Sequence, residues 1–248
     1  MADMTPSPTL NEYQIGWICA LPVEAAAAQE MLDEDFGTLE EQDTSDTNIY
    51  TLGRIGKHHV VIACLGGQYG TTSATTVANH MTRTFSKSLR IGLMVGIGGA
   101  IPSAANDIRL GDVVVSYPTG TSGGVLQYDM GKIGSSGELG QTGSLNSPPR
   151  ILLAAVNQMR AAVLRKDPVY YSYIQQAAQR NARTRRNFSY PGPQNDRLFQ
   201  VSFEHPVTAA DCDDCLQEWE VRRCEREETE PQVHYGIIAS GNAVIKNA

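Results

Sequence analysis

The chain has 248 residues and a formal net charge of -7, with 41% hydrophobic and 19% charged residues. This apolar content is enough for a sizeable core and excludes a disordered or fibrous chain. The acidic balance argues against a nucleic-acid-binding protein, whose affinity depends on Lys and Arg side chains that neutralise phosphates. No apolar run approaches the ~20 residues of a membrane-spanning helix, so no membrane partner is expected.

The N-terminal residues up to Glu12 are polar and lack the pattern of a signal peptide. The five cysteines are an odd number and are scattered along the chain. We therefore expect a cytoplasmic protein whose thiols are reduced, with a disordered tail over residues 1–12.

The N-terminal half alternates strands and helices. Residues 13–21 form an apolar run typical of a strand, Pro22 stands where a helix begins, and residues 23–32 are rich in helix formers. The acidic stretch 33–47 is expected to be a loop. Apolar runs and turn residues predict strands at 48–52 and 59–65, a helix at 71–85 and a strand at 91–95.

The C-terminal half is less regular. A strand is expected at 113–116, a Gly- and Ser-rich loop at 117–147 and helices at 148–164 and 170–186, and the apolar pattern returns as a strand at 233–239. We interpret residues 165–232 as a polar insertion in one domain that spans 13–248. The predicted fold is α/β, a three-layer sandwich around a mixed central β-sheet.

Two glycine-rich segments each follow an apolar strand, at residues 66–70 and 96–100. Ligands of α/β folds bind outside the carboxyl ends of strands, where small residues let the backbone approach closely. Tight turns explain the same glycines equally well. Neither segment has the spacing of a dinucleotide-binding or P-loop motif in the right context.

Two further features are a candidate catalytic carboxylate and a candidate metal site. Glu24 lies in the first turn of the first helix, where the helix dipole favours an ionised carboxylate that is able to act as a base; many first-turn glutamates only cap a helix. Cys212 and Cys215, with His205 before them and Cys224 after them, offer four ligands for a structural zinc ion. A second pair with metal spacing is missing, so ordinary thiols and no metal are the default expectation.

Several segments together resemble the nucleoside phosphorylase and nucleosidase superfamily, which includes purine and uridine phosphorylases. The similarity is strongest to its fungal branch, often fused to NACHT, ankyrin or tetratricopeptide modules. The segments that carry it follow the family order along nearly the whole chain: IGWICALPVE (15–24), MVGIGGAIP (94–102), DIRLGDVVVS (107–116), GGVLQYD (123–129), TGSLN (142–146), DRLF (196–199) and HYGIIASGN (234–242).

The resemblance implies cleavage of the N-glycosidic bond of nucleosides by phosphate or by water. Glu24 matches the glutamate that positions the attacking water in nucleosidases. Phosphorylases hold phosphate with an Arg and a Ser or Thr at the third strand exit, and Met94 and Ile97 stand at the corresponding positions. Neither side chain can bind an oxyanion, so hydrolysis is favoured. The family also implies a homo-oligomer and no cofactor.

By the same resemblance, Gly98 and Gly99 line the pocket for ribose and base, and Val244 and Ile245 pack on the base, with Asn242 in the adjoining turn. Some relatives act on adenine nucleotides. For such a substrate, the segment from Gly67 to Gly70 would be a candidate phosphate cradle.

The chain ends at Ala248, before the family's ribose-binding Glu and the Asp that protonates the leaving base, so the sequence is expected to be a C-terminally truncated domain. The prediction is hydrolysis of purine, and specifically adenine, nucleosides or nucleotides to free base. Two alternatives stay open: phosphorolysis to base and ribose 1-phosphate, and a degenerate module that binds a nucleoside or nucleotide without turnover.

Overall fold

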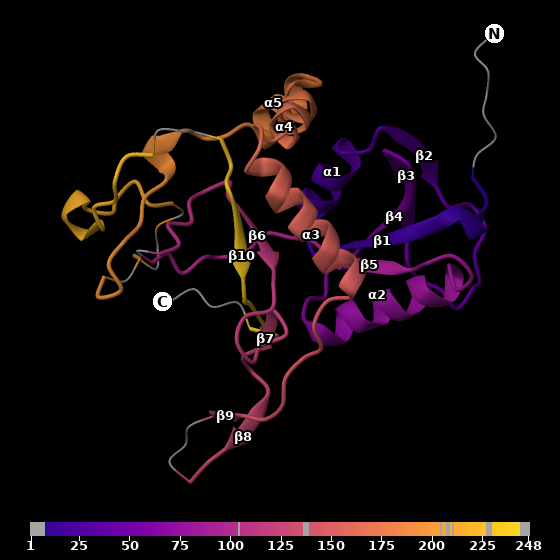
Figure 1. The fold of residues 1–248 in the computed structure, drawn as a ribbon, viewed down its shortest axis with the longest axis horizontal. Helices are drawn as coiled ribbons and strands as arrows, with labels where there is room; N and C mark the ends of the chain where they lie inside the picture. The colour runs from indigo at the N-terminus through magenta and orange to yellow at the C-terminus, as the bar shows by residue number, and fades with distance from the viewer. Residues whose placement is uncertain are drawn as a thin grey trace. The chain divides into compact units, whose positions relative to one another are not determined.

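A computed structural model describes residues 8–103, 105–135, 139–203, 205–206, 209, 211–226 and 230–243 (Figure 1). The chain divides into two compact units. The first unit comprises residues 1–98 and 173–188, and the second comprises 99–172 and 189–248. Residues 173–188, which lie within the predicted insertion, thus belong to the first unit.

The first unit is built on a five-stranded sheet with the order β2-β3-β4-β1-β5. β1 runs parallel to both β4 and β5, whereas β3 is antiparallel to β2 and β4. The predicted α/β fold with a mixed central sheet is therefore confirmed. The strands are β1 (Tyr13–Cys19), β2 (Glu34–Thr38), β3 (Tyr50–Ile55), β4 (His58–Cys64) and β5 (Ile91–Met94).

Strand β2 corrects the prediction of a loop over 33–47. Its sequence is polar because it is an edge strand, and its five residues are exposed or half-buried. β3 supplies the backbone partners, and Arg54 donates to both carboxylate oxygens of Glu34, at 3.1 and 2.6 Å. A partner distant in sequence therefore makes a strand where the local pattern shows none.

Two helices cover opposite faces of this sheet (Figure 1). Helix α1 (Pro22–Glu30) packs Ala28 with Cys19, Val60 and Ile62. Helix α2 (Thr71–Thr84) packs Val77 and Met81 on the other face, in a cluster with Tyr13, Tyr50, Val61, Ala63 and Phe85. Adjacent residues of β4 thus point to different clusters, as strand alternation requires. The first unit has the three predicted layers.

Part of the predicted N-terminal tail has regular structure. Residues 10–12 form a 3-10 helix, η1 (Leu10–Glu12), in which Glu12 accepts the backbone N–H of Thr9 at 2.7 Å. The hydroxyl of Ser88 donates to the carbonyl of Leu10 at 2.8 Å. Residues 1–7 lie outside the described residues. The predicted helical stretch at 170–186 forms α4 (Tyr170–Gln179) and α5 (Ala182–Phe188).

The second unit contains short paired strands. β6 (Val113–Ser116) has the predicted bounds and pairs in parallel with β10 (Val233–Gly236); β7 (Val125–Gln127) pairs in parallel with β11 (Ile238–Ser240). β8 (Gly131–Ile133) and β9 (Leu139–Gln141) form an antiparallel pair. Three strands therefore lie in the stretch predicted as loop. β8 and β9 pair with each other within it and β7 pairs outside it with β11, and each is only three residues long, too short to show an apolar alternation. The remaining elements are α3 (Arg150–Val163), η2 (Pro193–Asn195) and η3 (Gln217–Trp219).

Polar contacts hold the second unit together. Of its described hydrophobic residues, only Cys215 is buried. Asp112, which precedes β6, has a side chain only 1% exposed and accepts two hydrogen bonds from Arg226, at 2.8 and 2.9 Å. His234 of β10 lies 2.9 Å from the same carboxylate. Among the described residues, no helix is long and apolar enough to cross a membrane.

Candidate functional site at Glu24

The carboxylate of Glu24 is held by three backbone N–H groups. Oε2 accepts from Ala20 and Leu21, both at 2.8 Å, and Oε1 accepts from Ile97 at 2.7 Å. The first two donors belong to the turn between β1 and α1, and the third lies beyond the end of β5. Glu24 therefore connects the segment that follows β1 with the segment that follows β5, which are far apart in sequence.

The local sequence explains this position. Pro22 is the first residue of α1, where its missing N–H costs no hydrogen bond, and Glu24 is the third, where a carboxylate reaches back to the unpaired N–H groups of the preceding turn. Because β1 and β5 are neighbouring parallel strands, both end at the same edge of the sheet. A Cβ atom on Gly96 would lie 2.7 Å from Glu24 Oε1, so only glycine leaves room for the carboxylate.

Two thiols lie close to this carboxylate. Cys19 and Cys64 are register partners at the ends of β1 and β4. Burial, the neighbouring Cys64 and the charge of Glu24 raise the pKa of Cys19 to about 11. Burial and Glu24 also raise the pKa of Cys64. Both thiols are therefore protonated at neutral pH and are poor nucleophiles.

The residues expected to decide between phosphate and water are exposed. Met94 and Ile97 are 59% and 74% exposed, and what Ile97 contributes at Glu24 is its backbone N–H. Glu24 is half-buried, and its Oε1 accepts the N–H of Ile97, although a carboxylate oxygen can accept two hydrogen bonds. The arrangement can therefore orient a water molecule at a carboxylate that is fixed on three sides.

Gly67 lies in the turn after β4 with φ of 82°, a left-handed conformation that favours glycine. Next to it, a cleft of about 730 Å³ is lined by Gly66, Gln68 and Tyr69, together with residues of α1 and α2. Neither Gly67 nor Glu24 lines this cleft. The turn geometry accounts for Gly67, and its role in phosphate binding stays a prediction.

The other predicted site residues are divided between the units. Gly98 belongs to the first unit, whereas Gly99 and Asn242 belong to the second. Both glycines are exposed, and a Cβ atom on either would meet no atom within 4 Å. Asn242 donates its backbone N–H and its side-chain amide to Asp129 Oδ2, at 2.7 and 2.8 Å. Val244 and Ile245 lie outside the described residues.

The structure joins segments that the sequence shows only as separate motifs. The pairing of β7 with β11 brings GGVLQYD beside HYGIIASGN, where Asp129 meets Asn242. The pairing of β6 with β10 brings Asp112 to His234. The roles of Asp129, Arg226 and the Ile97 N–H could not be predicted from local sequence, because each acts through a partner more than 70 residues away.

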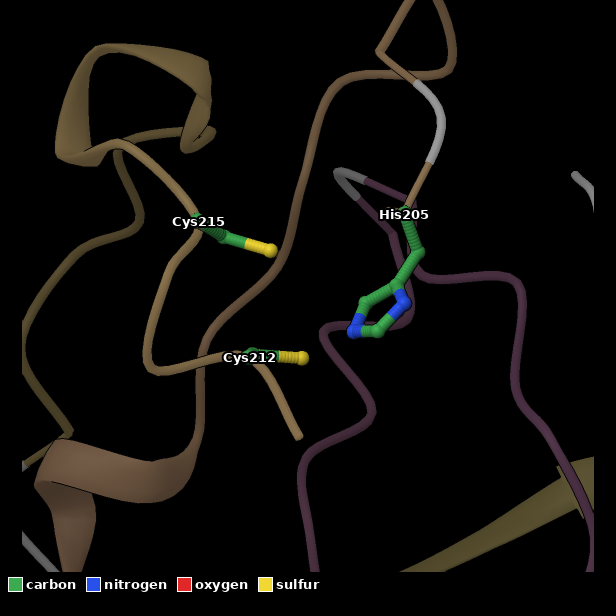
Figure 2. Close-up of side chains that lie close together, drawn as sticks. All are labelled: His205, Cys212 and Cys215. Atoms are coloured by element: carbon green, nitrogen blue, oxygen red, sulfur yellow. The ribbon is translucent and has the colours of Figure 1, made fainter. Parts of the chain in front are cut away.

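The candidate zinc ligands are brought together in part. His205, Cys212 and Cys215 form one group in the second unit (Figure 2), with ligand atoms all within 4.8 Å of one another. Cys224, the fourth ligand considered from the sequence, is described by the structure but does not belong to this group. It is exposed, and its carbonyl accepts a hydrogen bond from Arg109.

No family model matches the chain. A relative from the fungus Hyaloscypha variabilis, named nucleotide-binding leucine-rich repeat (NLR)-like protein, is 46% identical over 243 residues. These residues are 98% of this chain but 23% of that protein, so the chain spans less than a quarter of its relative.

Solved structures of nucleosidases are similar at low identity. Futalosine hydrolase of Helicobacter pylori gives a TM-score of 0.44 and 17% identity over 61% of this chain and 59% of that chain. The 5'-methylthioadenosine/S-adenosylhomocysteine nucleosidase of Neisseria meningitidis, in complex with methylthio-immucillin-A, gives 0.41 and 18% over 60% and 58%. At TM-scores below 0.5, these similarities assign no residue role in this chain.

Proposed function

We propose that this chain carries an N-ribosyl hydrolase site, which releases the free base from a purine, specifically an adenine, nucleoside or nucleotide. The observation that carries the proposal is the fixed carboxylate of Glu24, which three backbone N–H groups hold at the edge where β1 and β5 end. The motif resemblance assigns Glu24 to water positioning, and this geometry supports that role.

In the proposed reaction, Glu24 Oε1 accepts a hydrogen bond from a water molecule and takes its proton as the water oxygen bonds to the anomeric carbon of ribose. The bond from that carbon to the base nitrogen breaks. The departing base gains one proton, which balances the proton that the water loses to Glu24. The net reaction therefore consumes one water molecule. The rigid hold on Glu24 would position the water without reorganisation at the moment of reaction.

The side chains of Met94 and Ile97 support water over phosphate as the acceptor. A phosphate ion needs cationic or hydroxyl donors, and these two side chains offer neither. Phosphorolysis therefore remains the second candidate, and binding without turnover is the third. The NLR-like relative, which is much longer than this chain, supports a module that works inside a larger nucleotide-binding protein.

The test is release of free base by the purified chain from adenosine, AMP, ATP, guanosine, inosine and uridine, each with and without phosphate. We expect adenine release that does not depend on phosphate. Release that requires phosphate and yields ribose 1-phosphate would make the protein a phosphorylase. Calorimetric binding with no product would make it a binding module.

Glu24→Gln is the diagnostic variant, with Glu12→Gln as its matched control. Both glutamates occupy the third position of a helix and accept a backbone N–H, but Glu12 precedes β1 whereas Glu24 follows its far end. We expect Glu24→Gln to lower base release by about 10²–10⁴-fold and Glu12→Gln to leave it unchanged. Equal activity in the two variants would remove Glu24 from the mechanism.

A further inference from the structure

The second unit contains a histidine and two cysteines whose ligand atoms lie close together (Figure 2). His205, Cys212 and Cys215 place one nitrogen and two sulfur atoms within 4.8 Å of one another. We propose that these three side chains bind a Zn²⁺ ion through one nitrogen and two sulfur atoms, with the fourth coordination position filled by water or another non-protein ligand.

The backbone around the two cysteines is already fixed. The N–H of Cys215 donates to the carbonyl of Cys212 at 3.1 Å, which closes the Cys-x-x-Cys turn. The guanidinium of Arg197 donates to the carbonyls of both cysteines, at 2.5 and 2.7 Å. Arg197 is in turn held by Glu220 at 2.7 Å. Outer contacts of this kind orient metal ligands in known sites.

Each ring nitrogen of His205 faces a backbone carbonyl oxygen. Nδ1 lies 3.0 Å from the carbonyl of Pro206, and Nε2 lies 2.8 Å from the carbonyl of Asp211. A neutral imidazole has one N–H and can donate to only one of the two carbonyls. If Nδ1–H donates to Pro206, as metal-bound histidines commonly donate to a carbonyl, Nε2 carries the lone pair. A rotation of the imidazole ring then has to turn Nε2 from the Asp211 carbonyl toward the metal ion.

The dimensions and donor types suit zinc. Zn–S bonds of about 2.3 Å and Zn–N bonds of about 2.0 Å place tetrahedral ligand atoms roughly 3.5–3.8 Å apart. The three ligand atoms all lie within 4.8 Å of one another, so they need to approach by at most about 1.3 Å, which rotations of the side chains can supply. Thiolate and imidazole donors select zinc over magnesium or calcium, which prefer oxygen. Cys215 is buried and His205 is exposed, so a metal ion can reach the group from the side of His205.

The experiment uses the intact 248-residue chain, reduced and freed of metal by a chelator, and titrated with Co²⁺ and then Zn²⁺ in the absence of oxygen. We expect one equivalent of Co²⁺ to give the thiolate charge-transfer absorption of a tetrahedral site, and Zn²⁺ to displace it. Loss of a residue that only orients a metal ligand typically weakens metal binding by about 10–100-fold, and loss of a ligand itself should weaken it more. Cys212→Ser and Cys215→Ser should therefore abolish stoichiometric binding, and His205→Gln should weaken it.

Cys224→Ser is the matched control, since it removes a thiol from the same unit outside the group, and it should keep full binding. Alkylation of the wild-type chain tests the proposal even if the variants fail to fold: Zn²⁺ should protect Cys212 and Cys215 but not Cys224. Equal alkylation with and without Zn²⁺ would overturn the proposal. Resistance of both cysteines before metal addition, relieved only by a stronger reductant, would identify a disulfide instead.

Discussion

Glu24 Oε1 accepts the backbone N–H of Ile97 at 2.7 Å, across 73 positions of sequence. This one hydrogen bond connects the start of α1 to the segment that leaves β5. It also fixes the direction of the carboxylate, because Ala20 and Leu21 already hold its other oxygen. Of the three N–H groups that hold Glu24, Ile97 is the one that comes from outside the turn before α1.

Gly96→Ala should displace the Glu24 carboxylate without unfolding the protein. The new Cβ would lie 2.7 Å from Oε1, which is the end of a flexible side chain and can move aside. Since a shift of about 1 Å in a positioned group can cost 10²-fold in rate, we expect base release to fall by about 10- to 100-fold. The measurement is base release at saturating substrate, alongside thermal unfolding.

Gly92→Ala is the control for this variant. Gly92 lies on β5, four residues before Gly96, and a Cβ there would meet no atom within 4 Å. Its activity should equal that of the wild type. If Gly96→Ala retained full activity and wild-type stability, the hold on Glu24 would be unnecessary for catalysis.

Gly16→Ala should destabilise the first unit. Gly16 of β1 faces α2, and an added Cβ would lie 2.5 Å from Met81 Sδ and 3.3 Å from Leu89 Cδ1. Overpacking of this kind typically costs about 1–3 kcal/mol. Gly92 is the register partner of Gly16 across the β1–β5 pair but has open space. Urea unfolding should therefore show a lower midpoint for Gly16→Ala and an unchanged one for Gly92→Ala; equal midpoints would contradict the packing described between β1 and α2.

Asp112→Asn should destabilise the second unit. The change leaves Arg226 and His234 without their shared carboxylate, in a place where the Asp112 side chain is 1% exposed. Breaking one partner of a buried pair costs about 3–5 kcal/mol. Asp107→Asn removes a carboxylate from the neighbouring arginines, but this side chain is 39% exposed, so its cost should stay below about 1 kcal/mol. The free energy of unfolding of both variants, measured with denaturant, gives the comparison. Equal losses of stability would show that the burial of Asp112 does not cause the larger effect.

Acid should remove the contribution of Asp112 to stability. Burial alone raises the pKa of Asp112, but hydrogen bonds from Arg226, the Gln232 N–H and His234 outweigh it and hold this pKa well below its usual range. A lowered folded-state pKa gives stability that is fully present above the unfolded-state pKa of about 3.9 and is lost as the pH falls toward the folded-state pKa. The difference in unfolding free energy between wild type and Asp112→Asn should thus shrink between pH 5 and pH 2. A constant difference would contradict this assignment.

Local pattern was sufficient for the main elements of the first unit. The apolar run before Pro22 predicts the strand and helix that become β1 and α1, and the spacing of Val77 and Met81 predicts α2. These elements bury one face or one stripe, so their period is visible in the sequence. β2 was missed because an exposed edge strand needs no apolar alternation, and β7 was missed because its partner lies more than 100 residues away.

The sequence by itself determined that Glu24 would lie in the first turn of a helix at a strand exit, because Pro22 and the helix formers after it act through neighbouring residues. Only the tertiary structure decided that the Ile97 N–H holds this carboxylate, that Arg226 and His234 share Asp112, and that His205 joins Cys212 and Cys215 while Cys224 does not. The physical reason is that hydrogen bonds and metal sites depend on distances of a few ångströms between atoms. For residues far apart in the chain, those distances are set by strand pairing and turn geometry rather than by spacing in the sequence.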